Sequence, residues 1–272
     1  MRNPNLSHKN NLIQKKRRAA AESEEIQSLL NSAISGYAQY IRGISARGVL
    51  DYDLASTVHH LNSYVDKTKE LEKENSFFNW RSDFAGSVIP EFLYRIFSFN
   101  LTRLGVANHF STRDSVVEVT LGSNQGEPFN VRKKNQDLCV GNTYCPLPGG
   151  PEGQFFLVPS IVFEVKTNID INKLSGLDFS AERLKRSFPG AKYFLVTETV
   201  DFSLSDNYAS TSIDEIYCLR KQMRSAARRD RAPLQHEVFE SLLRDVTDIM
   251  AAQMITRGHV YERLESGRLI DG

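Results

Sequence analysis

Apolar positions recur with two different periods along this chain, one near both ends and the other in the middle. Over roughly 22–44, 51–73 and 82–101, apolar residues stand three or four positions apart, which is the period of an amphipathic helix. A broad apolar stripe over 234–254 has the same period. We therefore expect helices at both ends of the chain.

The middle of the chain changes to short runs that are apolar or rich in β-branched residues. Such runs are typical of strands. The Gly-, Asn- and Pro-rich stretches 122–130 and 146–151 predict loops between them. We expect strands over 116–121, 131–140, 155–167, 193–197 and 213–219.

One helix interrupts this series of strands. Ser175 and Asp178 have the spacing of a capping box, and Pro189-Gly190 ends the apolar period that follows. The order strand, strand, helix, strand predicts a mixed α/β core. We divide the chain into a basic N-terminal arm over 1–18, a helical region over 19–105, and an α/β core with a C-terminal helix over 106–272, which together form one compact unit.

Two charged residues stand in the otherwise apolar run 161–167. Side chains alternate between the two faces of a strand, so Glu164 and Lys166 emerge on the same face, beside Val162. Charged side chains are rarely buried in a strand unless they are paired, bind a ligand or take part in chemistry. Another acid, Asp137, lies upstream. An Asp followed by Glu-x-Lys is the arrangement of a metal-dependent phosphodiesterase.

The chemistry explains why these residue types would be combined. Hard divalent cations such as Mg²⁺ prefer oxygen ligands, which Asp137, Glu164 and the backbone carbonyl of Val165 would provide. Lys166 would orient the attacking water or stabilise charge on the phosphate. A Glu-x-Lys pair alone carries little weight, and the alternative is a salt bridge between Lys166 and an acid at a sheet edge. The apolar strand and the upstream acid favour the catalytic interpretation.

These residues also resemble a known signature. Asp137 with Glu164-Val165-Lys166 is similar to the PD-(D/E)XK motif, and the chain resembles a type II restriction endonuclease of that superfamily. Residues 160–220 resemble the enzymes that cut CCTNAGC-like sites. The resemblance implies a PD-(D/E)XK nuclease core in which the two acids and the lysine bind Mg²⁺ and activate water to cut double-stranded DNA. The chain departs from the signature at Gln136, where the motif has proline.

Glu91 is a further catalytic candidate. Nucleases of this superfamily often place an additional acid on a helix before the motif strands. The alternative is structural, because the helix dipole favours an acid in the first turn after Pro90.

The overall charge does not indicate a partner, but local clusters of basic residues do suggest where DNA would bind. Lys and Arg number 34 against 33 Asp and Glu, so the net charge of +1 does not indicate a partner. Basic residues are concentrated over 220–231, where phosphate binding and a solvated helix face are the two interpretations. The basic arm over 1–18 is open to the same two interpretations. We predict DNA contacts from Lys133, Lys134, Arg183, Arg186, Arg220, Lys221 and Arg224.

The apolar runs, the cysteines and the number of nuclease centres lead to expectations about cellular location and oligomeric state. The chain lacks an apolar run long enough to cross a bilayer or to act as a signal peptide, and its three cysteines lack metal-ligand spacing. We expect a reduced, cytoplasmic protein without membrane contacts. One centre addresses one phosphate at a time, so we expect a homodimer or a heterodimer with a related subunit, with the 234–254 stripe as one available surface.

Two other functions would use the same residues. One is a PD-(D/E)XK repair or junction nuclease of low sequence specificity. The other is a non-catalytic DNA-binding protein on a nuclease-like fold, against which the intact Asp137, Glu164 and Lys166 argue.

Overall fold

A computed structural model describes the protein over residues 3–45, 53–79, 84–112, 115–121, 129–146, 155–203, 211–252, 261 and 264–267. Within these ranges, every helix is too short or too polar to span a lipid bilayer. The expected loops at 122–130 and 146–151 fall almost wholly outside the described residues.

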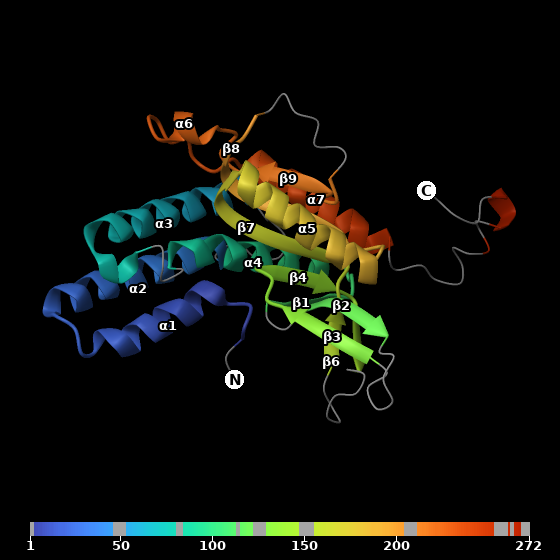
Figure 1. The fold of residues 1–272 in the computed structure, drawn as a ribbon. Helices are drawn as coiled ribbons and strands as arrows, with labels where there is room; N and C mark the ends of the chain where they lie inside the picture. Colours follow the sequence, from blue (N-terminus) through green and yellow to red (C-terminus); the bar gives the residue numbers. More distant parts are fainter. Residues whose placement is uncertain are drawn as a thin grey trace.

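A five-stranded mixed sheet lies at the centre of the molecule, in the order β1-β4-β7-β8-β9 (Figure 1). β4 pairs antiparallel with β1 and β7, whereas β7, β8 and β9 run parallel. Two hairpins, β2–β3 and β5–β6, form separate two-stranded sheets. The bounds are β1 His109–Ser111, β2 Ser115–Leu121, β3 Phe129–Lys134, β4 Leu138–Gly141, β5 Thr143–Pro146, β6 Phe155–Val158, β7 Ile161–Asp170, β8 Lys192–Asp201 and β9 Glu215–Cys218.

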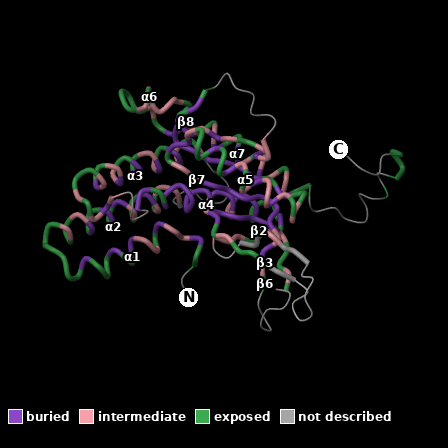
Figure 2. The backbone as a smooth tube through the Cα atoms, in the orientation of Figure 1, coloured by how far each residue is buried: buried purple, intermediate pink, exposed green. Residues whose placement is uncertain are grey.

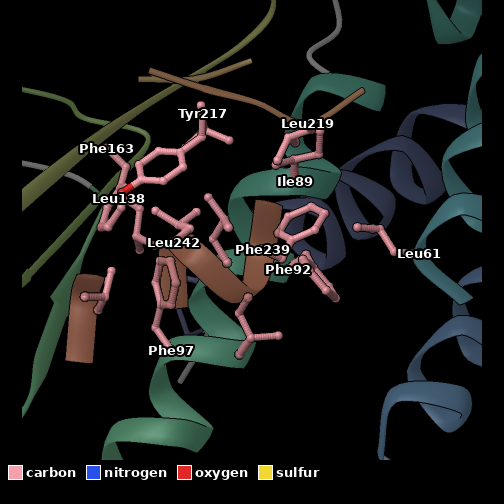
Figure 3. Close-up of a cluster of buried hydrophobic side chains, with 14 of the residues drawn as sticks. Leu61, Ile89, Phe92, Phe97, Leu138, Phe163, Tyr217, Leu219, Phe239 and Leu242 are labelled. Carbon is pink, nitrogen blue, oxygen red and sulfur yellow. The ribbon is translucent and has the colours of Figure 1, made fainter. Parts of the chain in front are cut away.

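Helices cover both faces of the sheet. α5 (Ile171–Ser187) packs on the face that carries Val162, and α4 (Val88–Arg103) and α7 (His236–Ala252) share a core with the face that carries Phe163. The rings of Phe97 on α4 and Phe163 on β7 stack with centroids 5.1 Å apart, and Figure 3 shows them within the larger cluster. The predicted alternation along β7 is therefore confirmed. Figure 2 shows mostly buried residues along β7 and α4, whereas buried, intermediate and exposed residues alternate along α7.

The N-terminal third is helical, as the periodicity predicted. α1 (Ser7–Ala19), α2 (Glu24–Ser45) and α3 (Leu54–Glu74) pack together around a second apolar cluster that includes Leu12, Leu30 and Phe78. Short 3-10 turns follow at Ser76–Phe78 (η1) and Ala85–Ser87 (η3), and a four-residue helix, α6 (Arg224–Ala227), comes after β9. The segment expected to be a basic arm is thus largely helix α1, with one face buried.

Several expected boundaries were wrong. The strand expected over 131–140 breaks at residues 135–137, which are poor strand formers, and β3 then pairs in a separate hairpin with β2. The strand expected over 155–167 breaks at Pro159, which lacks an N–H donor for a sheet ladder.

The start of helix α5 and the role of the C-terminal stripe also differ from expectation. α5 begins at Ile171 because Asp170 caps it, its Oδ1 accepting a 2.9 Å hydrogen bond from the backbone N–H of Lys173. Ser175 lies inside the helix and donates to the carbonyl of Ile171. The apolar stripe of α7 packs against the chain's own core through Phe239, Leu242, Val246 and Met250, so this face is not available to a partner.

One buried histidine holds α1 in place. The His8 side chain is within hydrogen-bonding distance of three groups that follow it by 56 or more positions. These distances fit the neutral tautomer in which Nδ1 donates to the Phe84 carbonyl (3.0 Å) and Nε2 accepts from the Tyr64 hydroxyl (2.6 Å). Burial lowers the pKa of His8 from 6.5 to about 4.

The depressed pKa of His8 predicts a loss of stability in acid. Between pH 6.5 and 4 the unfolded chain binds a proton at this position and the folded chain does not, so stability falls as pH decreases through this window. The expected contribution is roughly 3 kcal/mol by pH 4. Urea unfolding of the wild type and of His8→Gln at several pH values measures this contribution. The difference between their free energies of unfolding should become smaller as pH falls. A difference that does not depend on pH would contradict a neutral buried His8.

Candidate active site

The structure brings the three motif residues together on two adjacent strands. Asp137 directly precedes β4, while Glu164 and Lys166 lie on β7, which pairs with β4 in the register Leu138 to Phe163. The ammonium nitrogen of Lys166 is 3.0 Å from Asp137 Oδ2 and 2.8 Å from Glu164 Oε2. The backbone N–H of Val165 donates to the same Asp137 oxygen at 2.7 Å. Backbone and side-chain hydrogen bonds therefore fix the geometry of Asp137, Glu164 and Lys166, which we call the triad.

A second lysine reaches the triad from outside the central sheet. Lys134, at the end of β3, places its ammonium nitrogen 3.2 Å from Glu164 Oε1 and 3.3 Å from the Ser180 hydroxyl on α5. An ion pair between Glu118 on β2 and Arg183 on α5 also holds this hairpin to the helix. Lys134 was predicted to contact DNA; in the structure it forms an ion pair with Glu164, and the DNA contact stays a prediction.

The pKa shifts at the site favour a charged Glu164 and a charged Lys166, whereas burial raises the pKa of Asp137. Glu164 is only 5% exposed, and burial alone would raise its pKa. Lys166 and Lys134 outweigh that effect and hold the pKa of Glu164 below its usual value. Burial likewise opposes the charge of Lys166, but Asp137 and Glu164 raise the pKa of its ammonium group. At neutral pH the site therefore combines an ionised glutamate with a charged lysine.

The donor set suits a hard divalent cation. Asp137 and Glu164 both place a carboxylate oxygen within 3.0 Å of the same lysine nitrogen, so the two carboxylates converge on one point. Among the described residues there is no group of three or more His, Cys, Asp or Glu side chains that could hold a metal. A cation here would thus have two carboxylates at most, with other oxygens from a backbone carbonyl, water or substrate. Mg²⁺ is commonly bound in this way.

The triad opens into a large cleft. The cleft has a volume of about 930 Å³ and contains Asp137 and Lys166 together with residues of α1, α3, α6 and the start of α5. Seven basic and three acidic side chains line it, which leaves an excess of four positive charges. The basic residues are Lys69, Lys166, Lys173, Arg220, Arg224, Arg228 and Arg231, and the acidic ones are Glu72, Asp137 and Glu198.

A buried carboxylate organises part of this positive surface. Glu198 on β8 accepts hydrogen bonds from Arg220 Nε (2.9 Å) and Nη2 (2.8 Å) and from Arg231 Nη2 (2.8 Å), and Lys69 lies 3.5 Å away. Arg220 was predicted to contact DNA. It lines the cleft but is only 2% exposed, and its guanidinium donates to Glu198 and to the Ala232 carbonyl. Sequence patterns did not reveal Glu198, Lys69 or Lys173, because no motif marks them and their approach to the cleft depends on contacts between distant segments.

The other predicted DNA contacts have different surroundings. Arg224 lines the cleft and pairs with Asp201 at 3.1 Å, whereas Lys221 is exposed and lies 3.8 Å from Glu237. Lys133 is exposed on β3. Arg183 pairs with Glu118, and Arg186 pairs with Glu182 at 2.5 Å; neither arginine is among the residues that line the cleft.

Glu91 belongs to a separate network. It is 1% exposed, and its carboxylate accepts hydrogen bonds from Tyr37 (2.5 Å), from Arg95 and from the backbone N–H of Lys9. These contacts join α4 to α1 and α2. The structure therefore shows Glu91 as a buried acid that joins three helices, and its predicted catalytic role stays a prediction.

Comparisons with known proteins agree with one another. Residues 82–232 match the model of the Bpu10I restriction endonuclease family, a range that includes the whole triad and the basic segment 220–231. A solved structure of the native BbvCI A2B2 tetramer is similar to this chain, with a TM-score of 0.71 and 39% sequence identity, over 94% of this chain and 100% of that chain. The curated proteins contain no match.

Proposed function

Because the chain belongs to the Bpu10I restriction endonuclease family and is thus a type II site-specific nuclease, we propose that it cuts double-stranded DNA at a Mg²⁺-dependent centre of the PD-(D/E)XK type. The observation that carries this proposal is the convergence of Asp137, Glu164 and Lys166, of which Asp137 and Lys166 line a basic cleft. Family membership favours this function over the repair nuclease and over the non-catalytic DNA-binding protein.

Each residue of the triad has a separate task in the proposed reaction. Asp137 and Glu164 would hold Mg²⁺, with the Val165 carbonyl as a further ligand, and Mg²⁺ when bound would act as a Lewis acid toward the phosphodiester. Lys166, held by both carboxylates, would orient the attacking water and stabilise negative charge that develops on the phosphate. Lys134 fixes the second oxygen of Glu164 and so limits the rotation of its carboxylate.

The basic lining of the cleft would hold the DNA. Arg224, Arg228 and Arg231 come from one short segment and can neutralise successive phosphates. Glu198 fixes the guanidinium of Arg231, which reduces the entropy lost when a phosphate binds.

Cutting both strands requires more than one centre. The two backbones of a duplex have opposite polarity, and the single triad of this chain can address one scissile phosphate at a time. The similar BbvCI structure is an A2B2 tetramer. We therefore propose that this chain also works in an assembly with a second nuclease subunit, identical or related, and that the target is a CCTNAGC-like site.

Digestion of supercoiled plasmid with Mg²⁺ tests the function. The expected products are discrete fragments whose sequenced ends share one CCTNAGC-like sequence. Fragments of random length would contradict site specificity. A product nicked in only one strand, at a fixed sequence, would instead indicate that a second subunit is required.

A further inference from the structure

Helix α1 presents a neutral, hydrogen-bonding surface to the cleft. Asn10, Asn11 and Gln14 are spaced one and three positions apart, which places them on one side of a helix, and all three line the cleft. We call these three residues the amide face. Among the described residues of α1, none of those that line the cleft is charged, although α1 itself is basic.

The amide face differs in chemistry from the α6 side of the same cleft. There, Arg224, Arg228 and Arg231 provide positive charge. Figure 1 shows α6 and α1 at the same end of the molecule, above and below the end of α3. Protein–DNA interfaces divide in the same way, since cations contact phosphates and position the duplex, whereas side chains with paired donors and acceptors read base edges.

The amide face is held rigidly. The hydroxyl of Ser7 donates to the Ser87 carbonyl (2.9 Å), His8 is fixed by Phe84 and Tyr64, and Lys15 binds the Phe77 carbonyl. These contacts join α1 to elements more than 50 positions away in sequence. A fixed helix loses little conformational entropy when it binds, and discrimination between bases depends on fixed donor and acceptor positions.

Gln14 is the member best placed for recognition. It is exposed, and within the described part of the chain its amide has no hydrogen-bond partner. Asn10 donates to the Asn3 carbonyl at 2.9 Å, which orients its side chain. A carboxamide carries a donor and an acceptor side by side, and this pair matches N6 and N7 of adenine in the major groove.

We propose that the amide face of α1 determines sequence specificity by reading base edges, with Gln14 recognising an adenine, in the DNA whose scissile phosphate lies at the triad. This assignment rests on the proposed function, because it places DNA in the same cleft. Arg224, Arg228 and Arg231 then supply affinity that does not depend on sequence.

Selection from randomised DNA duplexes measures how much Gln14 contributes to base preference. Duplexes that bind the protein are selected in the presence of Ca²⁺. Every protein tested carries Lys166→Ala, so that cleavage does not remove the bound DNA. Gln14→Ala should lose its preference at one adenine position by roughly tenfold or more. Its salt dependence should not change, since no phosphate contact is lost.

Two further variants make the test specific. Gln39→Ala removes an exposed glutamine of α2 outside the cleft and should keep the full preference. Arg228→Ala should weaken binding to all sequences alike and lower the slope of log affinity against log salt by about one.

The outcomes separate this inference from the proposed function. If Gln14→Ala keeps its base preference, or loses affinity for all sequences alike with a smaller salt slope, then α1 does not read bases. Neither outcome would contradict the proposed nuclease centre. A wild-type protein that neither binds nor cuts DNA would overturn both.

Discussion

Replacement of Lys166 by alanine is expected to reduce the rate of DNA cleavage by about a thousandfold or more, while DNA affinity changes little. The ammonium group bridges Asp137 and Glu164 at 3.0 and 2.8 Å, and in the proposed reaction it stabilises the charge that develops on the phosphate. Loss of one such stabilising group typically costs about two to three orders of magnitude, and the loss of its hold on both carboxylates adds to this. Single-turnover cleavage and gel-shift titration measure the two quantities separately.

Controls distinguish chemistry from folding in the Lys166 variant. Lys192→Ala removes an exposed lysine of the neighbouring strand β8, outside the residues that line the cleft, and should cut at the wild-type rate. Lys166→Ala should unfold cooperatively in urea, since Lys134 still compensates Glu164. Cleavage by Lys166→Ala at the wild-type rate would remove Lys166 from the mechanism.

Removal of divalent cations is expected to abolish cleavage. Asp137 and Glu164 provide an all-oxygen donor set for Mg²⁺, and Mn²⁺ suits the same ligands. Ca²⁺ is larger, binds oxygen at longer distances and accepts irregular geometry, so it should permit DNA binding but reduce cleavage to near background. Cleavage in EDTA, Mg²⁺, Mn²⁺ and Ca²⁺, each with a parallel binding measurement, gives the comparison.

A direct measurement of metal binding supports this test. Titration calorimetry with Mn²⁺ should detect a site in the wild type that is weakened in Glu164→Gln, whereas Glu182→Gln, an exposed acid on α5, should not change it. Full activity in excess EDTA would contradict the metal-dependent mechanism whatever the calorimetry shows.

Patterns within one segment were sufficient to predict much of the fold. The helical period identified α2, α3 and α7 to within three residues, because each buries one continuous apolar face, whereas α4 begins about six residues later than expected. Strand alternation placed Glu164 and Lys166 on one face of β7, and the opposite face carries Phe163 in the core, as expected. These predictions succeeded because local periodicity and tertiary burial agree in those segments.

The features that were missed depend on contacts between distant segments. Lys134 approaches Glu164 because β3 leaves the central sheet to form a hairpin, which the sequence of β3 alone does not indicate. Arg220 looked like a surface cation in a basic run, yet Glu198, 22 positions earlier, draws it into the interior. Part of the basic cluster over 220–231 therefore lines the cleft, but the sequence does not indicate which of its members are buried in ion pairs.

The residues that line the cleft lie far apart in the sequence, and this separation affects the order in which the parts of the cleft are synthesised. Residues of α1 line one side and residues 220–231 the other, with the triad between them in sequence. Contacts of such long sequence separation form late, because loop closure must precede them. During translation the triad would leave the ribosome before the arginines of residues 224–231. We therefore expect the growing polypeptide to bind duplex DNA only after residues 224–231 have been made.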